Sequence, residues 1–127
     1  MKRIINTQDA PAPIGPYNQA VAYGNTLYTS GQIALDPVSM ELVIGSIEAE
    51  TTQVMENLKA VLAAGGMDFS HVVKSSIFIS DMGNFSRINE IYARYFDAEF
   101  APARETVQVA ALPKYVNVEI SMIAVKG

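Results

Sequence analysis

Hydrophobic positions recur at helical spacing in two stretches of the chain. The first stretch runs from Glu48 to Ala64, and Gly65-Gly66 directly after it favours a helix end there. The second runs from Asn84, a residue type that caps helices, to Phe96. The apolar residues at this spacing are Val54, Leu58, Val61 and Leu62 in the first stretch, and Phe85, Ile88, Tyr92, Tyr95 and Phe96 in the second. These patterns predict two amphipathic helices, each with one buried face.

Shorter apolar segments predict strands on either side of these helices. Gln19–Tyr23 and Thr26–Ser30 enclose Gly24-Asn25, a two-residue connection typical of a β-hairpin with a type I′ or II′ turn. The other strand segments are Lys2–Asn6, His71–Ser80, Ala101–Pro113 and Asn117–Val125.

The order of these elements is strand, hairpin, helix, strand, helix, strand, strand. Two helices cover only one face of such a sheet. In the closing strand, however, Ile123 and Val125 lie on the face opposite Val118 and Ile120. An apolar second face without helices implies a further subunit. We therefore predict an α+β domain with a mixed sheet of about six strands, which assembles through its open face and has sites between subunits.

Composition narrows the class of protein. The 127 residues correspond to one domain, residues 1–127. With no cysteine and a single histidine, His71, the chain lacks the residues for zinc–thiolate sites and for paired-imidazole catalysis. A net charge of −4 argues against nucleic acid as a partner. Because no apolar run is long enough to span a bilayer and no signal peptide is present, we expect a cytoplasmic protein that does not enter membranes.

Two charged residues in the last strand segments suggest chemistry. Glu119 interrupts an apolar strand, where an unpaired charge is costly to bury, and Arg104 follows a proline at the start of the preceding segment. If these segments are antiparallel neighbours joined through Leu112–Val116, both side chains reach one cleft. An arginine fork and a carboxylate together suit a small anionic substrate and a positioned water. The alternative is an ion pair that closes a subunit interface.

Other polar or conformationally special residues have both a functional and a structural interpretation. Tyr17 follows a proline-rich loop that holds it in place, and it either serves a site or packs the loop. Gly31, after Ser30, permits close approach of a ligand to the backbone or simply marks a strand exit. Asn89 lies beside the apolar stripe of its helix and points to solvent or into a cleft. His71 fits a surface position better than a catalytic one.

Several segments, in order from near the N-terminus to the end, together resemble the Rid family (reactive intermediate deaminases, the YjgF-type proteins). The segments are Ala12–Tyr17, Thr29–Gln32, Asn57–Lys59 leading to Ala64–Gly66, Val73-Lys74, Asn89–Tyr92, Pro102–Arg104, Leu112-Pro113 and Val118–Ile120. The resemblance implies a chorismate-mutase-like α+β fold and a homotrimer with three clefts between subunits.

The resemblance also implies a function. It is the cofactor-free and metal-free hydrolysis of enamines and imines, such as 2-aminoacrylate, to 2-keto acids and ammonia, the activity of a 2-iminobutanoate/2-iminopropanoate deaminase. Arg104 matches the carboxylate-binding arginine of the family and Glu119 its water-positioning carboxylate. The positions that match cleft-lining residues are Tyr17, Ser30, Gly31, Asn89 and Thr106.

The chain departs from the family pattern at two places. Thr106 stands where many members carry cysteine, and Asp36–Met40 lacks the glycine usual in that turn. Two other functions stay open. One is an endoribonuclease or translation inhibitor, which the acidic charge disfavours. The other is a non-catalytic module that binds a small keto acid or amino acid.

Overall fold

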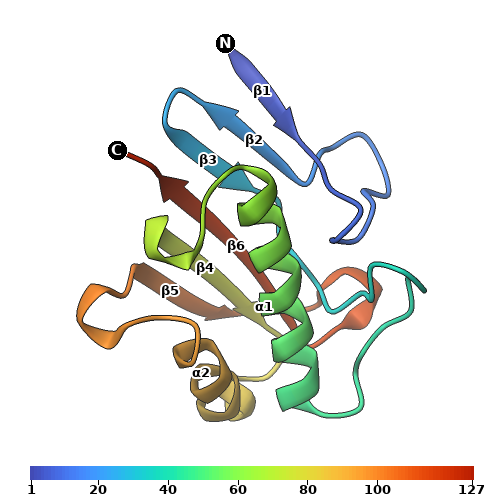
Figure 1. Ribbon diagram of the computed structural model, residues 1–127. Coiled ribbons are helices and arrows are strands. Elements are labelled where there is room, and N and C mark those ends of the chain that lie inside the picture. The colour runs from blue at the N-terminus through green and yellow to red at the C-terminus, as the bar shows by residue number, and fades with distance from the viewer.

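The computed structural model describes residues 1–127 and consists of one six-stranded sheet with two helices on one of its faces (Figure 1). The strand order across the sheet is β1-β2-β3-β6-β4-β5. The strands are β1 (Lys2–Ile5), β2 (Ala20–Tyr23), β3 (Thr26–Thr29), β4 (Val72–Ile79), β5 (Ala103–Gln108) and β6 (Val118–Val125), and the helices are α1 (Ile47–Ala64) and α2 (Phe85–Ala93). The predicted α+β class, the order of elements and the two helices are confirmed.

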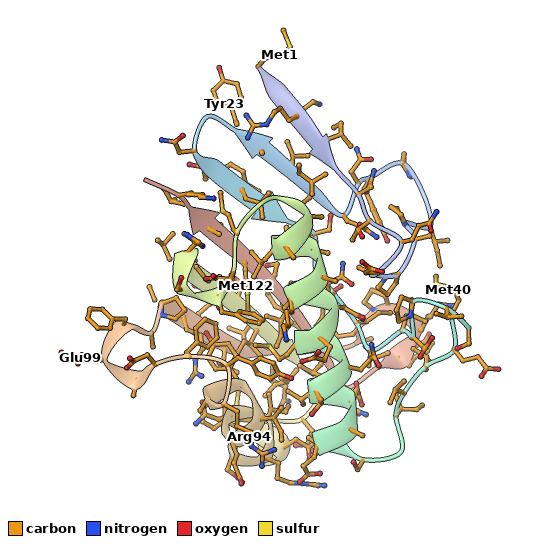
Figure 2. The ribbon with its side chains drawn as sticks, viewed as in Figure 1. Met1, Tyr23, Met40, Arg94, Glu99 and Met122 are labelled. Atoms are coloured by element: carbon orange, nitrogen blue, oxygen red, sulfur yellow. The ribbon has the colours of Figure 1, made fainter.

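The predicted hairpin is present with the expected register. Tyr23 pairs with Thr26 across the two-residue turn. Gly24 has a φ of 59°, whereas Asn25 does not have a positive φ. A positive φ at the first turn position alone is the pattern of a type II′ turn, which explains the glycine there. Tyr23 at this end of the hairpin points away from the molecule (Figure 2).

Helix α1 begins and ends within a residue of the predicted bounds. The side chain of Ser46 caps it by accepting a hydrogen bond from the backbone N–H of Ala49 at 3.0 Å. At the other end Gly66 adopts a left-handed φ of 75°. The buried stripe includes every apolar residue predicted for it, and it packs on Leu27, Ile77 and Ile120 of the sheet. This helix therefore covers the centre of the sheet (Figure 1).

Helix α2 is shorter than predicted. It ends at Ala93, and Asn84 makes no side-chain capping bond. Instead Asp81 caps the preceding turn by accepting from Gly83 N–H. Tyr95 and Phe96, assigned to the helical stripe by their spacing, lie beyond the helix and pack around Phe69, with ring centroids 5.2 and 5.3 Å away. Aromatic packing outside the helix has replaced the last helical turn.

The predicted antiparallel pairing of the last two strand segments is wrong. Strand β4 lies between them, antiparallel to β6 and parallel to β5. Parallel neighbours need a crossover connection, and α2 provides it between β4 and β5. The physical reason is composition: β4 carries apolar residues on both faces and gains most from two neighbours, whereas the polar strand Ala-Arg-Glu-Thr-Val-Gln suits the edge.

The turn without its usual glycine keeps a left-handed residue. Met40 has a φ of 59°, and it lies in a loop at the periphery of the molecule (Figure 2). Asp36 organises this loop, since its carboxylate accepts hydrogen bonds from Val38 and Ser39 N–H at 2.8 and 3.0 Å. These backbone bonds lower the pKa of Asp36.

The sheet face without helices exposes apolar side chains. Tyr28, Val107 and Val125 on this face are between 38 and 49% exposed. No membrane-spanning helix is present, because neither helix is both long and apolar enough.

Candidate functional site

Arg104 and Glu119 project from opposite faces of the sheet. Arg104 pairs in register with Ser75 of β4, and Glu119 pairs with Phe78. Since Ser75 and Phe78 are three residues apart on one strand, their side chains and those of their partners point to opposite faces. Arg104 is on the helix side and Glu119 is on the open side. Within one chain the two therefore occupy separate cavities, and the expectation that a single chain brings them to one cleft is wrong.

Glu119 lines a cavity of about 270 Å³ at the edge of the open face. The proline-rich loop before β2 forms one wall, and the segment that continues β3 forms another. The cavity brings together four of the seven predicted site residues, namely Tyr17, Ser30, Gly31 and Glu119. Apolar lining residues are Pro11, Pro13, Ile14, Ile33 and Leu35.

The carboxyl group of Glu119 lies directly against the backbone of Gly31. A Cβ atom at position 31 would be 2.8 Å from Glu119 Cδ and 2.9 Å from Oε2, closer than real contacts allow. Gly31 does not have a positive φ, so the glycine is required by this close approach rather than by its backbone conformation. Its N–H and C=O make no hydrogen bonds within the chain, and both are available to a ligand.

The environment of Glu119 favours proton transfer. Burial removes water from the carboxyl group and raises its pKa above the ordinary value of 4.5. No cation within the chain offsets this effect. A carboxyl group in a cavity whose pKa is raised by burial is a candidate for accepting and returning a proton.

Tyr17 and Ser30 are held by bonds within the chain. The phenol oxygen of Tyr17 accepts a hydrogen bond from Ile14 N–H at 3.4 Å, and the ring is 49% exposed. The hydroxyl of Ser30 donates to the carbonyl of Asn18 at 2.5 Å. Tyr17 therefore lines the cavity with a ring held by the proline-rich loop, and Ser30 offers its oxygen lone pairs but not its proton.

Arg104 is braced on the helix face by α2. Its guanidinium stacks over the rings of Tyr92 and Phe85, 5.1 and 5.6 Å from their centroids. One terminal nitrogen, Nη1, donates to Asn89 Oδ1 at 2.6 Å. These contacts fix the plane of the guanidinium and leave its remaining N–H groups free to bind an anion. Arg104 and Asn89 line a second cavity of about 370 Å³.

The buried neighbours of Arg104 form a rigid base. Tyr92 is buried, and its hydroxyl donates to Ser75 Oγ at 2.9 Å.

Thr106, two residues along β5, lies in neither cavity. Its Oγ1 is buried without a hydrogen-bond partner, and this unpaired hydroxyl is the one buried side-chain polar atom that the chain leaves unsatisfied.

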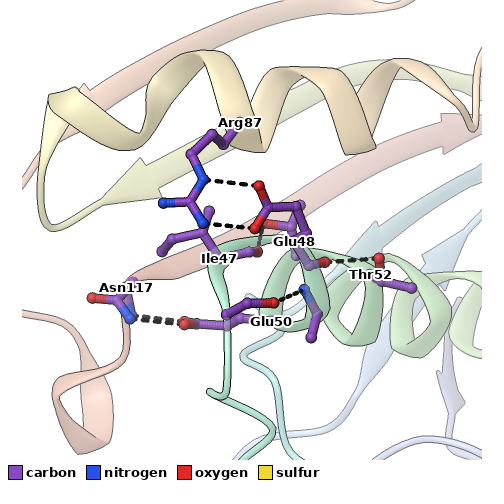
Figure 3. A network of polar contacts seen from close by, with 9 residues as sticks. Ile47, Glu48, Glu50, Thr52, Arg87 and Asn117 are labelled. Carbon is purple, nitrogen blue, oxygen red and sulfur yellow. Dashed lines mark hydrogen bonds and ion pairs between the residues drawn. The ribbon is translucent and has the colours of Figure 1, made fainter.

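A buried carboxylate fixes the start of β6 just before Glu119. Glu50 of α1 is fully buried, and its carboxylate accepts from Asn117 N–H, Asn117 Nδ2 and Val118 N–H at 2.7, 2.8 and 3.2 Å (Figure 3). Beside it, Arg87 of α2 pairs with Glu48 through two hydrogen bonds of 2.7 and 2.8 Å (Figure 3). This pairing lowers the pKa of Glu48 to about 2. Together these contacts tie both helices to the strand that carries Glu119.

Some residues around the two cavities were not singled out by the sequence analysis. Lys114 lines the Glu119 cavity, and its position next to Pro113 in a resembling segment was the available signal. Phe85 and Tyr92 were assigned to the core, yet their rings also carry Arg104. His71 is part of a capping box with Asp68, away from both cavities. No group of three or more acidic or histidine side chains is arranged to hold a metal.

Comparison with known proteins assigns the family. The model of the endoribonuclease L-PSP family matches residues 7–126. The chain is 55% identical to protein DfrA of Myxococcus xanthus, covering 98% of this chain and 95% of the relative. It is 48% identical to the 2-iminobutanoate/2-iminopropanoate deaminase of Capra hircus, covering 100% and 92%.

Solved structures agree with the sequence relatives. The crystal structure of a Rid-family protein of unknown function from Yersinia pestis superposes with a TM-score of 0.96 at 46% identity, covering 99% of this chain and all of the other. The fold and these relatives thus define a small α+β protein of the Rid type. The chain belongs to the endoribonuclease L-PSP family, which includes the Rid proteins and the named imine deaminases.

Proposed function

We propose that the protein hydrolyses 2-imino acids and their enamine tautomers to 2-keto acids and ammonia, in clefts that two subunits build together. Membership of the family and 48% identity to a named 2-iminobutanoate/2-iminopropanoate deaminase support this activity. The observation that carries the proposal is the division of the site. A desolvated carboxyl group faces one side of the sheet, and a braced, unpaired guanidinium faces the other.

Neither the Glu119 cavity nor the Arg104 cavity performs the reaction alone. The Glu119 cavity has a group that moves protons but no arginine to hold an acid, and the Arg104 cavity has no carboxylate to activate water. Assembly through the open sheet face, where Tyr28 and Val107 are half-exposed, supplies the missing half from a neighbouring chain. We propose the homotrimer implied by the family resemblance as this assembly.

Arg104 binds the substrate carboxylate through parallel hydrogen bonds. Because Nη1 is occupied by Asn89 at 2.6 Å, the carboxylate takes the other edge of the guanidinium, formed by its remaining N–H groups. The rings of Phe85 and Tyr92 keep the guanidinium plane fixed, so that the imine carbon of the bound substrate lies at a defined distance from Glu119.

Glu119 holds the water that attacks this carbon. The substrate reacts as the protonated imine. As the water oxygen bonds to C2, Glu119 accepts one of the water protons, and the C=N electron pair moves to nitrogen to give a neutral carbinolamine. Glu119 then returns this proton to the amino group, which leaves as ammonia, and the hydroxyl proton passes to Glu119 as the C–O bond becomes the keto group. The free N–H of Gly31 and the lone pairs of Ser30 suit the polar end of the substrate, and Tyr17 excludes bulk water.

The test is a coupled assay. Serine or threonine dehydratase generates the enamine, and the appearance of keto acid is followed with and without this protein. We expect the protein to accelerate keto-acid release, and we expect Glu119→Gln and Arg104→Ala proteins that melt no lower than the wild type to lose the effect. No acceleration by the wild-type protein would contradict the proposal.

The same preparations test the two other functions. A non-catalytic binding module would be protected against heat unfolding by a keto acid without accelerating its release. An endoribonuclease would cleave RNA, and cleavage that persists in Arg104→Ala and Glu119→Gln proteins would point to contamination. The proposal predicts faster keto-acid release in the dehydratase-coupled assay and no RNA cleavage that depends on Arg104 or Glu119.

A further inference from the structure

The connection between β5 and β6 contains a strained turn that the proposed reaction does not use. Lys114 and Tyr115 have φ values of 55° and 56°, so two consecutive residues other than glycine adopt the left-handed region. The turn is closed by Tyr115 N–H donating to Leu112 O at 2.9 Å and Val116 N–H donating to Pro113 O at 3.3 Å. Such backbone persists where the surroundings impose it, commonly at functional sites.

Packing of Tyr115 does not explain the strain, because its side chain is 88% exposed. The turn does have one effect on the site: Pro113 and Lys114 become part of the wall of the Glu119 cavity. Lys114 and Glu119 are the two charged residues among the 14 that line it. The left-handed turn therefore places Lys114, a cationic residue, in the wall of this cavity.

The ammonium of Lys114 has no partner within the chain. It takes part in none of the salt bridges of the molecule and in no side-chain hydrogen bond, although Glu119 lines the same cavity. The remaining lining is neutral, with apolar residues such as Pro11, Ile14 and Leu35. A lysine in this position is available to a ligand rather than engaged in the fold.

We propose that Lys114 binds a second acidic group of the substrate, so that the protein accepts imines of dicarboxylic amino acids such as aspartate and glutamate. This inference rests on the proposed function. Arg104 holds the carboxylate next to the imine carbon and Glu119 delivers water to it. The side-chain carboxylate then reaches Lys114, the cation that lines the Glu119 cavity.

The absence of a partner for Lys114 favours this class of substrate. The second carboxylate of a dianionic imino acid pairs with Lys114 while the first pairs with Arg104, whereas an imino acid with an aliphatic side chain gives Lys114 no partner. The cavity of about 270 Å³ exceeds by several-fold the roughly 30 Å³ that one water molecule occupies, which leaves room for a side-chain carboxylate beside the attacking water. The class of reaction that supplies such an imine is oxidation of an acidic amino acid by a flavin-dependent oxidase.

The test compares two imines generated in the assay by amino-acid oxidases, one from aspartate and one from alanine. Lys114→Asn removes the ammonium and keeps a residue type that tolerates left-handed backbone, and Lys114→Arg keeps the charge. Lys59→Asn is the matched control, because Lys59 is exposed on α1 outside this cavity. Melting temperatures establish that each variant is folded.

We expect Lys114→Asn to lower kcat/KM for the aspartate imine by about tenfold to a hundredfold, the effect of losing one charge-assisted contact, and to leave the alanine imine within about twofold. Lys114→Arg should retain most of the activity on the aspartate imine. The inference is overturned if Lys114→Asn changes neither imine or lowers both equally. If the wild-type protein accelerates neither imine, the proposed function fails as well, so the two failures are distinguishable.

Discussion

The substitution Gly31→Ala should displace the carboxyl group of Glu119 without destabilising the fold. The added Cβ would lie 2.8 Å from Glu119 Cδ, whereas ordinary contacts begin at 3.4 Å. The carboxyl group must therefore move by about 0.6 Å, and the three atoms nearest to the new methyl group all belong to Glu119. A shift of this size in a water-positioning group lowers kcat by about tenfold to a hundredfold.

The fold should tolerate the change. Gly31 does not have a positive φ, so alanine adopts its backbone conformation without strain. Replacement of glycine at such a position stabilises a protein by about 0.4–1 kcal/mol through the unfolded state, which offsets the displaced side chain. We expect the free energy of unfolding of Gly31→Ala to stay within about 1 kcal/mol of wild type, as measured by urea denaturation.

Gly45→Ala is the matched control. Gly45 also has no positive φ, and a Cβ there meets no atom within 4 Å. In the dehydratase-coupled assay the control should keep the wild-type rate while Gly31→Ala loses it. Wild-type turnover by Gly31→Ala would refute the assignment of Glu119 as the group that positions water.

Four further substitutions test other parts of the account. Arg104→Lys should lose nearly as much kcat/KM as Arg104→Ala, about a hundredfold, since the fork and its stacking are lost with the guanidinium; near-normal turnover would exclude bidentate binding. Because burial raises the pKa of Glu119 in the folded state, its ionisation costs stability above that pKa. Glu119→Gln should therefore melt higher than wild type at pH 7 and lose this advantage as the pH falls to 4.5, and the acid limb of wild-type kcat/KM should lie above pH 4.5. Glu50→Ala should lower the free energy of unfolding by about 3 kcal/mol in urea, since it strands the buried N–H groups at the start of β6; a loss below about 1 kcal/mol would contradict that role. Met40→Gly should raise it by up to about 1 kcal/mol, because glycine removes the left-handed strain at φ 59°, and a decrease would show that the methionine side chain outweighs the strain.

Local periodicity in the sequence was sufficient to predict the helices and strands but not to predict which strands lie side by side. The stripe of α1 and the turn at Gly24-Asn25 depend on residues close in the chain, and both have the predicted form. The position of β5 depends on long-range pairing. A helix between two strands was visible in the sequence and favours a parallel crossover, which was the signal for placing β5 beside β4.

The same limit applies to the candidate site. Alternation along each strand correctly separated Arg104 from Val107 and Glu119 from Ile120. Whether Arg104 and Glu119 share a face depends, however, on the register of both strands against β4, which alternation does not specify. The sequence did not indicate a turn at Lys114, because this left-handed turn contains neither glycine nor asparagine, the residue types that normally mark such backbone.

Mixed assemblies test the shared site most directly. Arg104→Ala and Glu119→Gln proteins are each expected to be inactive, and they are unfolded together in equal amounts and refolded. If each cleft takes its arginine from one chain and its glutamate from the next, random mixing restores about a quarter of the clefts and so about a quarter of the wild-type rate. A mixture no more active than the two separate proteins would contradict the composite site.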